Sequence, residues 1–315
     1  MKQYLNLLKT IINDGVQRED RTGIGTKSIF GTQLRFNLED GFPAVTTKKL
    51  AWKSVVSELL WFLEGSTNEH RLAEIKAGKK YSQLSQTEKK TIWTDNAENQ
   101  GKALGYTNGE LGHIYGKQWR NWQSSTFKKV PVLTNLLEKF GITYYKEDFK
   151  SIDQILRVIA TIKTDPFSRR HIVNAWNVAD LDVMSLPPCH MMFQFFVEPD
   201  AEGKPEKLSL MWYQRSVDVG LGLPFNIASY ALLLSIIAKL TNLKPHEVIF
   251  TGGDTHIYLN HLDALNEQSK LRPYKLPSLE LPEFNSFDEL LKCSVSDFKL
   301  INYKHRKSIE MKMAI

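Results

Sequence analysis

Two prolines and a cysteine stand at the start of an apolar stretch, SLPPCHMMFQFFVE, which runs from Ser185 to Glu198. Proline fixes the backbone φ angle and restricts the residue before it, so Pro187 and Pro188 hold Cys189 in a narrow range of directions. A thiol becomes a nucleophile when nearby positive charge stabilises its thiolate, whereas a buried thiol without such help is inert packing. Cys189 is therefore a candidate nucleophile, with packing as the alternative for any single cysteine.

The neighbouring histidine is poorly placed to activate this thiol. Adjacent residues on a strand point to opposite faces, so His190 is not expected to act as a base for Cys189. This argues against a hydrolase built on a Cys-His pair, and no other base is evident. Cys189 and Cys293 are 104 positions apart, which suits neither a disulfide framework nor a metal-ligand spacing. We expect a free thiol and no metal.

Arginines are better candidates for the activating charge. They occur in the loop RTGIGT, in the triplet SRR and in the triplet QRS, as Arg21, Arg169, Arg170 and Arg215, the last followed by Ser216. A guanidinium binds phosphate oxygens bidentately, and a serine hydroxyl adds a further donor. Each arginine alone is more often part of a surface ion pair. Together with Cys189 they suggest a phosphorylated substrate held beside a thiolate.

Other polar groups could orient a ring substrate. His256 and Tyr258 are two residues apart, so both leave one face of an extended segment, although a half-buried strand with amphipathic ends explains the same pattern. Asn226 follows GLGLPF, and its amide offers a donor and an acceptor to a heterocycle edge.

One carboxylate lies in an unusually apolar helix. Glu58 falls between Trp61 and Phe62 in AWKSVVSELLWFLEG, a segment that is apolar nearly all round. Burial there would raise the pKa of the carboxyl group. The alternative is a glutamate at the helix edge that reaches water.

Composition is that of a globular protein. The chain has 315 residues, of which 42% are hydrophobic and 24% charged, and a net charge of +6, which favours anionic partners such as nucleic acid, folates or nucleotides. The densest basic segment, residues 76–90, has no aromatic platform beyond Tyr81 and reads as a solvated helix or loop. No window approaches the ~18 apolar residues of a membrane span, and the N-terminus lacks the apolar core of a signal peptide. We expect a cytoplasmic protein.

Hydrophobic periodicity sets the elements that must position these groups. It predicts helices over 2–13, 51–65, 151–166 and 225–243, and strands over 27–38, 169–178, 189–198, 207–216 and 247–261. Residues 65–150 are more polar, and SQLSQTEKK and SSTFKKVP are interpreted there as loop or insertion. There is no βα alternation, phosphate-binding loop, internal repeat or low-complexity linker, so we predict one α+β domain over 1–315.

The motifs together resemble the thymidylate synthase family, in the family's order and over nearly the whole chain. They are RTGIGT, FPAVTTKK, ELLWFLEGSTN, IYGKQWR, SRRHIVNAWN, LPPCH, WYQRSVDVGLGLPFNIASYA, GGDTHIYLNH and the terminal MAI. The resemblance implies a single domain with a large mixed β-sheet flanked by helices, and family-variable insertions near 71–90, 123–150 and 198–206. It also implies a homodimer formed through the sheet.

The activity implied is reductive methylation of dUMP to dTMP, with 5,10-methylenetetrahydrofolate as co-substrate and dihydrofolate as second product. The implied nucleophile is Cys189, which adds to C6 of uracil, because C5 is a poor carbon nucleophile until the 5,6 bond is saturated. The other catalytic residues implied are Glu58, Tyr115, Arg215, Asp218, Asn226 and His190.

The resemblance also assigns binding residues. Those for dUMP are Arg21, Gln214, Arg215, Ser216, Asp218, Asn226, His256 and Tyr258, with Arg169 and Arg170 donated by the partner subunit. Those for folate are Lys48, Trp93, Asp218, Gly222, Phe225, Ala314 and Ile315. One departure is His113 in LGHIYG, where the family usually has proline.

Two other functions compete with this interpretation. A deoxyuridylate hydroxymethylase of the same fold adds water instead of hydride, and Asn226 favours uracil over cytosine without excluding that reaction. A basic nucleic-acid-binding protein fits the net charge, since arginines that bind phosphate can also touch RNA.

Overall fold

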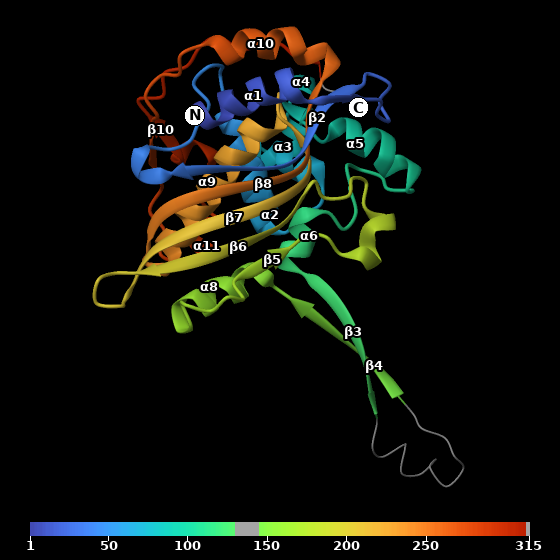
Figure 1. The fold of residues 1–315 in the computed structure, drawn as a ribbon. Coiled ribbons are helices and arrows are strands. Elements are labelled where there is room, and N and C mark those ends of the chain that lie inside the picture. Colours follow the sequence, from blue (N-terminus) through green and yellow to red (C-terminus); the bar gives the residue numbers. More distant parts are fainter. Residues whose placement is uncertain (130–144, 313–315) are drawn as a thin grey trace.

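A six-stranded sheet forms the centre of the computed structural model, which describes residues 1–129 and 145–312 (Figure 1). The strand order is β1-β2-β8-β7-β6-β5. The strands are β1 Val16–Arg18, β2 Thr26–Asn37, β5 Ile172–Asn174, β6 His190–Pro199, β7 Pro205–Asp218 and β8 Lys244–Tyr258. The pair β7 and β8 is parallel and the other pairs are antiparallel. The sheet is therefore mixed, as predicted.

Helices pack behind this sheet in the view of Figure 1 and make the fold α+β. The described helices are α1 Lys2–Asp14, α2 Trp52–Glu64, α3 Glu69–Ala77, α4 Gln86–Lys89, α5 Thr94–Asn96, α6 Tyr115–Arg120, α8 Gln154–Thr164, α9 Gly222–Thr241, α10 Leu262–Lys270 and α11 Phe287–Leu290. The predicted helices at 2–13, 51–65, 151–166 and 225–243 correspond to α1, α2, α8 and α9.

The long helix α9 fills the core against β7, β8 and α2. Among the described residues it is the one helix with the length and hydropathy to cross a membrane, yet 83% of its most apolar window is buried inside the fold. A helix that is apolar all round and enclosed by protein is a core helix. It ends at Asn242, whose φ of 58° is the left-handed conformation that asparagine tolerates at a helix C-terminus.

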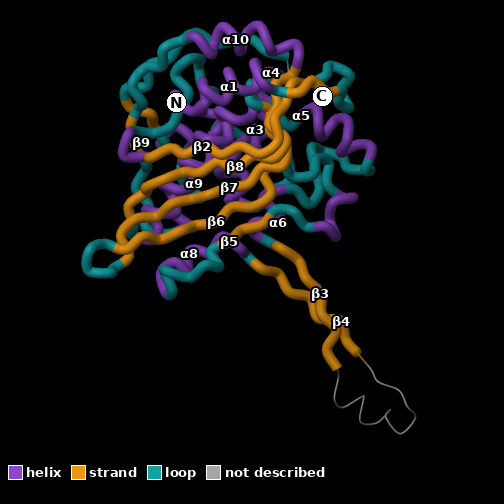
Figure 2. Tube along the Cα trace, viewed as in Figure 1, coloured by secondary structure: helices purple, strands orange, loops and turns teal. Residues whose placement is uncertain are grey.

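The described part of the polar region between α2 and α8 contains regular structure. SSTFKKVP was interpreted as loop or insertion; its residues up to Lys129 belong to β3 Trp122–Lys129, which pairs with β4 Tyr145–Ile152 in an antiparallel ribbon, and its last two residues lie outside the described residues. The tube view shows this ribbon extending away from the sheet (Figure 2). The sequence of β3 shows no regular apolar alternation, which is the pattern that strand prediction detects.

Three smaller differences concern short elements. SQLSQTEKK contains the helical turn α4, which begins with a capping box between Ser85 and Glu88. The strand expected over 169–178 is limited to β5. A separate two-stranded sheet joins β9 Ser278–Glu280 and β10 Lys299–Ile301, which the sequence did not reveal. Strands of three residues are too short for hydrophobic alternation to be detected in the sequence.

Candidate active site

Cys189 ends the loop that leads into β6, and neighbouring segments fix its backbone. Its N–H donates to the Tyr115 hydroxyl at 2.7 Å, and its carbonyl accepts from the Arg215 N–H at 2.9 Å. Tyr115 opens α6 and Arg215 lies on β7, so the cysteine is held from two directions. The side chain is half-buried.

The Arg215 side chain holds the same loop. Its Nε and Nη2 donate to the carbonyls of Pro188 and Pro187, both at 2.9 Å, and its guanidinium carbon lies 5.3 Å from the centre of the Trp176 ring. Because proline lacks an N–H but keeps its carbonyl, the two prolines supply acceptors for this fork. The sequence predicted an arginine near Cys189, and the structure places Arg215 there.

Burial and charge act on the thiol in opposite directions. Burial raises the pKa of Cys189, while Arg215 and Arg21 lower it. The effect of burial is the larger, so the net change in the pKa of Cys189 is upward. The two guanidinium groups reduce the free energy needed to form the thiolate.

A turn organised by Asp20 presents Arg21. The Asp20 carboxylate accepts hydrogen bonds from the N–H groups of Thr22 and Gly25 at 3.2 and 2.9 Å, and from the Thr22 hydroxyl at 2.8 Å. β2 begins at Thr26, which pairs with Tyr258 on β8. The turn therefore lies at the same end of the sheet as Tyr258, and the exposed Arg21 side chain lowers the pKa of Cys189 from there.

Glu58 is buried, and the alternative that it reaches water at a helix edge is wrong. Its side chain lies on α2 with 5% of the residue exposed, and Oε1 accepts from the Trp93 indole N–H at 2.7 Å. Burial raises the pKa of the carboxyl group to about 7, an effect that the Trp93 hydrogen bond partly opposes. A carboxyl group titrating near neutral pH can both give and take a proton.

Tyr115 lies between the Glu58 and Cys189 regions. Its ring stacks on His190 with centroids 4.2 Å apart and lies 5.9 Å from the Trp93 ring. His190 Nδ1 is 2.8 Å from the Tyr230 hydroxyl, and burial lowers the histidine pKa to about 3. His190 is therefore neutral and contacts the Tyr230 hydroxyl, and that it does not serve Cys189 as a base stays a prediction.

Asn226 is held by the glutamine of QRS. Its Nδ2 donates to Gln214 Oε1 at 3.0 Å, and Gln214 Nε2 donates to the Ser216 carbonyl at 3.0 Å. Gln214 lies on β7 opposite His190 of β6. The structure thus joins these predicted residues to the Cys189 strand.

The ends of β7 and β8 bring together three further predicted residues. Asp218 is the register partner of His256 in the parallel pair. The His256 ring lies 5.2 Å from the Tyr258 ring, and its Nδ1 is 3.1 Å from Asp254 Oδ1. Asp218 Oδ1 accepts from the N–H groups of Gly220 and Leu221 at 2.8 and 3.1 Å, which orders the turn into α9.

Several residues assigned to folate lie at this turn or next to it, whereas Trp93 lies beside Glu58. Gly222 begins α9, and Phe225 packs partly buried against the core. Lys48 is buried and donates to the Gly220 carbonyl, and burial lowers its pKa to about 8. Trp93 is the buried donor to Glu58. Ala314 and Ile315 lie outside the described residues.

The last described residues reach the same end of the sheet. His261 Nε2 lies 2.7 Å from the Lys312 carbonyl oxygen, and the His261 ring lies 5.8 Å from that of Tyr258. Within residues 1–129 and 145–312 no group of three or more His, Cys, Asp or Glu side chains could hold a metal ion.

Sequence reasoning missed several supporting residues. Tyr230 binds His190, Trp176 packs on Arg215, and Asp20 orders the Arg21 turn. Tyr230 follows Asn226 by four residues, so helical spacing placed both on one face and could have identified it. Trp176 carried no comparable signal, because its contact depends on how two distant segments meet.

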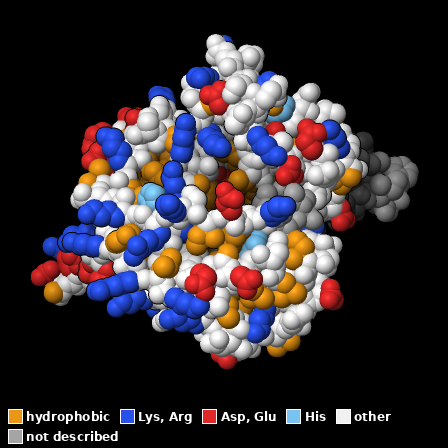
Figure 3. Space-filling model, turned by 90° about the horizontal axis from the view of Figure 1, so that it is seen from above, with side chains coloured by type: hydrophobic (Ala, Val, Ile, Leu, Met, Phe, Trp, Pro, Cys, Tyr) orange, Lys and Arg blue, Asp and Glu red, His pale blue; other side chains and the backbone are white. Residues whose placement is uncertain are grey.

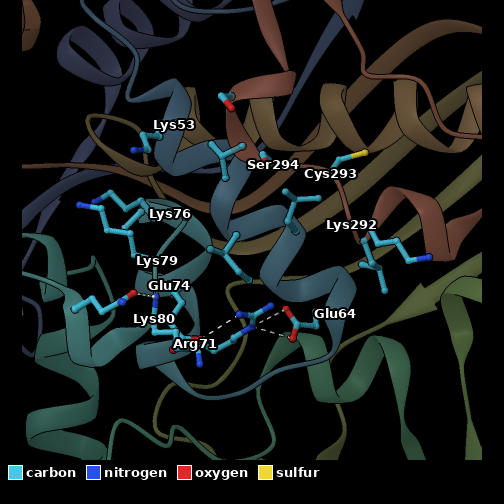
Figure 4. Close-up of a pocket in the computed structure, with 18 residues that line it drawn as sticks. Lys53, Glu64, Arg71, Glu74, Lys76, Lys79, Lys80, Lys292, Cys293 and Ser294 are labelled. Carbon is cyan, nitrogen blue, oxygen red and sulfur yellow. Dashed lines mark hydrogen bonds and ion pairs between the residues drawn. The ribbon is translucent and has the colours of Figure 1, made fainter.

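A cleft elsewhere on the molecule, about 600 Å³ in volume, contains none of the predicted site residues (Figure 4). Several lysines line it, but its arginine is neutralised, since Arg71 pairs with Glu64 at 2.9 Å and Glu74 at 3.1 Å. On the face shown in Figure 3, Lys and Arg side chains gather over the left half and around the central hollow, with acidic side chains among them.

Comparison with known proteins identifies the family. The model of the family described as thymidylate synthase matches residues 2–315. The chain belongs to the thymidylate synthase family. It is 48% identical over 316 residues to a probable thymidylate synthase of Escherichia phage T5, and 46% identical over 325 residues to the thymidylate synthase of Enterobacteria phage T4, with all of each chain covered. The crystal structure of the phage T4 thymidylate synthase superposes with a TM-score of 0.83 at 45% identity, again over all of both chains.

These matches confirm the fold class and the activity expected from the sequence. The chain is a methyltransferase that makes dTMP, and the hydroxymethylase alternative is not favoured. The thymidylate synthase family uses 5,10-methylenetetrahydrofolate as co-substrate, so dUMP and a reduced folate are the implied ligands.

Proposed function

We propose that Cys189 is the nucleophile in the reductive methylation of dUMP. Its thiolate adds to C6 of uracil, the electrons of the 5,6 bond move into an O4 enolate, and C5 forms a bond to the methylene carbon of the folate. As this bond forms, the carbon separates from one folate nitrogen, and after C5 loses its proton the bond to the second nitrogen breaks. The resulting tetrahydrofolate transfers a hydride to the methylene carbon and leaves as dihydrofolate, while the C6–S bond breaks, which returns the Cys189 thiolate and releases dTMP. The observation that carries the proposal is Arg215, held beside Cys189 by the Pro187 and Pro188 carbonyls.

Glu58 manages protons at the pyrimidine O4. Its pKa of about 7 lets it stabilise the enolate as an acid and then accept the proton back. Tyr115, whose hydroxyl touches the Cys189 N–H, assists removal of the C5 proton with water. Neutral His190 helps to order that water through its contacts with Tyr115 and Tyr230.

The remaining residues hold the nucleotide. Asn226, oriented by Gln214, reads the O4 and N3 edge of uracil. His256 and Tyr258 contact the deoxyribose hydroxyl, since their rings share one end of β8. The phosphate is bound by Arg21, Arg215 and Ser216, where the two arginines already act electrostatically on Cys189.

The folate binds over the nucleotide at the turn into α9. Asp218 and Trp93 contact its ring system, Gly222 and Phe225 line the entrance, and Lys48 meets its glutamate. Ala314 and Ile315 complete the C-terminal segment that closes over both ligands and excludes water. The contact of Lys312 with His261, whose ring lies 5.8 Å from that of Tyr258, supports this arrangement.

Two copies of the chain form the working enzyme through the open face of the sheet. Large apolar side chains are exposed on it, with Phe196 62% exposed and Met211 and Ile172 also exposed. An exposed apolar face of this kind is typical of an interface. Arg169 and Arg170 precede β5 at the edge of this sheet, and neither side chain forms an ion pair among the described residues. We assign both to the partner's phosphate site.

Subunit mixing tests this assignment. Cys189→Ala chains and Arg169→Ala/Arg170→Ala chains, each inactive alone, should recover part of the activity when refolded together, because one of the two sites in a mixed dimer is then intact. Mass spectrometry verifies that mixed dimers form. Mixed dimers without activity would contradict shared sites.

A paired assay tests the chemistry. Purified protein receives C5-tritiated dUMP and 5,10-methylenetetrahydrofolate, and both tritium release and dihydrofolate absorbance are followed. We expect equal rates for the two signals and loss of both in Cys189→Ala, with Cys293→Ala as the matched control that retains them. Tritium release without dihydrofolate would instead indicate hydroxymethylation.

A further inference from the structure

The carboxylate of Asp180 joins the segment that carries Tyr115 to the segment that carries Cys189. Asp180 lies in the 3-10 helix Val178–Val183, and its Oδ2 accepts from Gln118 Nε2 at 2.6 Å and from Asn177 Nδ2 at 3.1 Å. His113 Nδ1 lies 3.3 Å from the same oxygen. That nitrogen is buried and has no hydrogen-bond partner among the described residues. One carboxylate oxygen thus faces three nitrogens.

Two of the residues that face Asp180 lie on either side of Tyr115 in the chain. His113 precedes the tyrosine by two residues and Gln118 follows it by three, and Gln118, which is 1% exposed, also donates to the His113 carbonyl at 2.9 Å. The chain runs from Asp180 to Cys189 in nine residues, and the Cys189 N–H returns to the Tyr115 hydroxyl at 2.7 Å. Covalent chain and hydrogen bonds therefore close a ring through Asp180, Tyr115 and Cys189.

Backbone contacts keep the two segments from sliding past each other. Gly112 forms an isolated bridge with Met184, and Ser185 N–H donates to the Leu111 carbonyl at 3.0 Å. Gly112 has a φ of 77°, and a Cβ there would lie 2.0 Å from the Val183 carbonyl oxygen. Only glycine allows the backbone at position 112 to come this close to the Val183 carbonyl. The backbone contacts between the two segments are therefore fixed in position.

We propose that Asp180 is a positioning residue that sets the Tyr115 hydroxyl against Cys189, with His113 as its second contact on the tyrosine segment. The proposal rests on the function proposed above for Tyr115 in removing the C5 proton. A proton transfer depends on donor and acceptor positions to within a fraction of an ångström. Hydrogen bonds to an ionised acceptor are stronger than those to a neutral one, so the negative charge of Asp180 strengthens its contacts with the segment that carries Tyr115.

Asp180→Asn tests the role with little change in shape. We expect kcat and C5-tritium release to fall about fivefold together, with the KM for dUMP nearly unchanged, since a misplaced proton-transfer group slows chemistry more than binding. Asp182→Asn is the matched control, because Asp182 is an exposed acid on the same 3-10 helix. The thermal midpoints of the two variants should agree, which separates positioning from folding.

Two further comparisons locate the effect. In a Tyr115→Phe background, Asp180→Asn should cause no additional fall in tritium release. His113→Asn, whose amide nitrogen can replace Nδ1, should retain more activity than His113→Leu. If Asp180→Asn behaves like Asp182→Asn, or acts equally with and without the Tyr115 hydroxyl, Asp180 does not position Tyr115. If Tyr115→Phe itself leaves tritium release unchanged, the proposed role of Tyr115 fails and the Asp180 proposal fails with it.

Discussion

Cys189 and Glu58 lie on either side of Tyr115 and are controlled by different physical means. Cys189 is half-buried, and hydrogen bonds from β7, α6 and its own prolines fix its position. Glu58 is almost wholly buried, and within residues 1–129 and 145–312 its carboxyl group accepts one hydrogen bond, from Trp93, so burial sets its proton affinity. The nucleophile needs direction and nearby charge, whereas the proton relay needs a pKa near the working pH. The two regions therefore respond differently to substitution.

Glu58→Gln should give the largest change. Loss of the proton relay should lower kcat by roughly 10² to 10⁴, the usual range for general acid–base catalysis. Steady-state kinetics at pH 7 measures this. Glu69→Gln is a matched control, since Glu69 is also buried and burial also raises its pKa, yet it binds Thr91. An equal fall in kcat for both variants would show a general effect of buried carboxylates.

The same substitution should change how stability depends on pH. A free glutamate has a pKa near ~4.3 and folded Glu58 one of about 7, so the folded state binds its proton more tightly. Below about pH 4, protonated Glu58 makes its full contribution to the free energy of unfolding. As the pH rises to 7 this contribution is lost, and the free energy of unfolding falls by about 3 kcal/mol. Urea unfolding at pH 5 and pH 8 should show that wild type loses more stability than Glu58→Gln across this interval. Parallel curves would contradict the raised pKa.

Arg215→Lys tests the geometric side of the comparison. Lysine keeps the charge but cannot donate to both proline carbonyls as a planar fork, so the Cys189 loop should lose its position. We expect kcat/KM to fall about 10- to 100-fold. Arg71→Lys removes another multiply bonded arginine, outside the site, and should leave kcat/KM unchanged. Full activity in Arg215→Lys would mean that charge alone suffices at Cys189.

Trp93→Phe should have the smallest effect, and it tests the electrostatic control of the Glu58 pKa. It removes the N–H that lowers the pKa of Glu58, so that pKa should rise. The pH profile of kcat should move upward by the same amount, with little change at its maximum. A downward movement would show that the indole does not stabilise the ionised carboxylate.

Local patterns in the sequence were sufficient for much of this site. Pro187 and Pro188 indicated a directed thiol, the apolar surroundings of Glu58 indicated a raised pKa, and alternation placed His190 away from Cys189. Each inference depends on neighbours within a few residues, which act the same way wherever the segment lies in the fold. The main helices and strands followed from hydrophobic period for the same reason. The β3–β4 ribbon did not, because its sequence lacks a regular apolar alternation.

Contacts between distant segments required the tertiary structure. The sequence could not show that the Arg215 guanidinium binds the proline carbonyls, that Trp93 donates to Glu58, or that Asp180 contacts the segment around Tyr115. The partners in these contacts lie 27, 35 and more than 60 residues apart in the chain. Packing of the sheet and α9 decides which side chains meet, and the chain pattern records only that they are buried or polar. The sequence by itself determined which groups could react; the fold decided which partners control them.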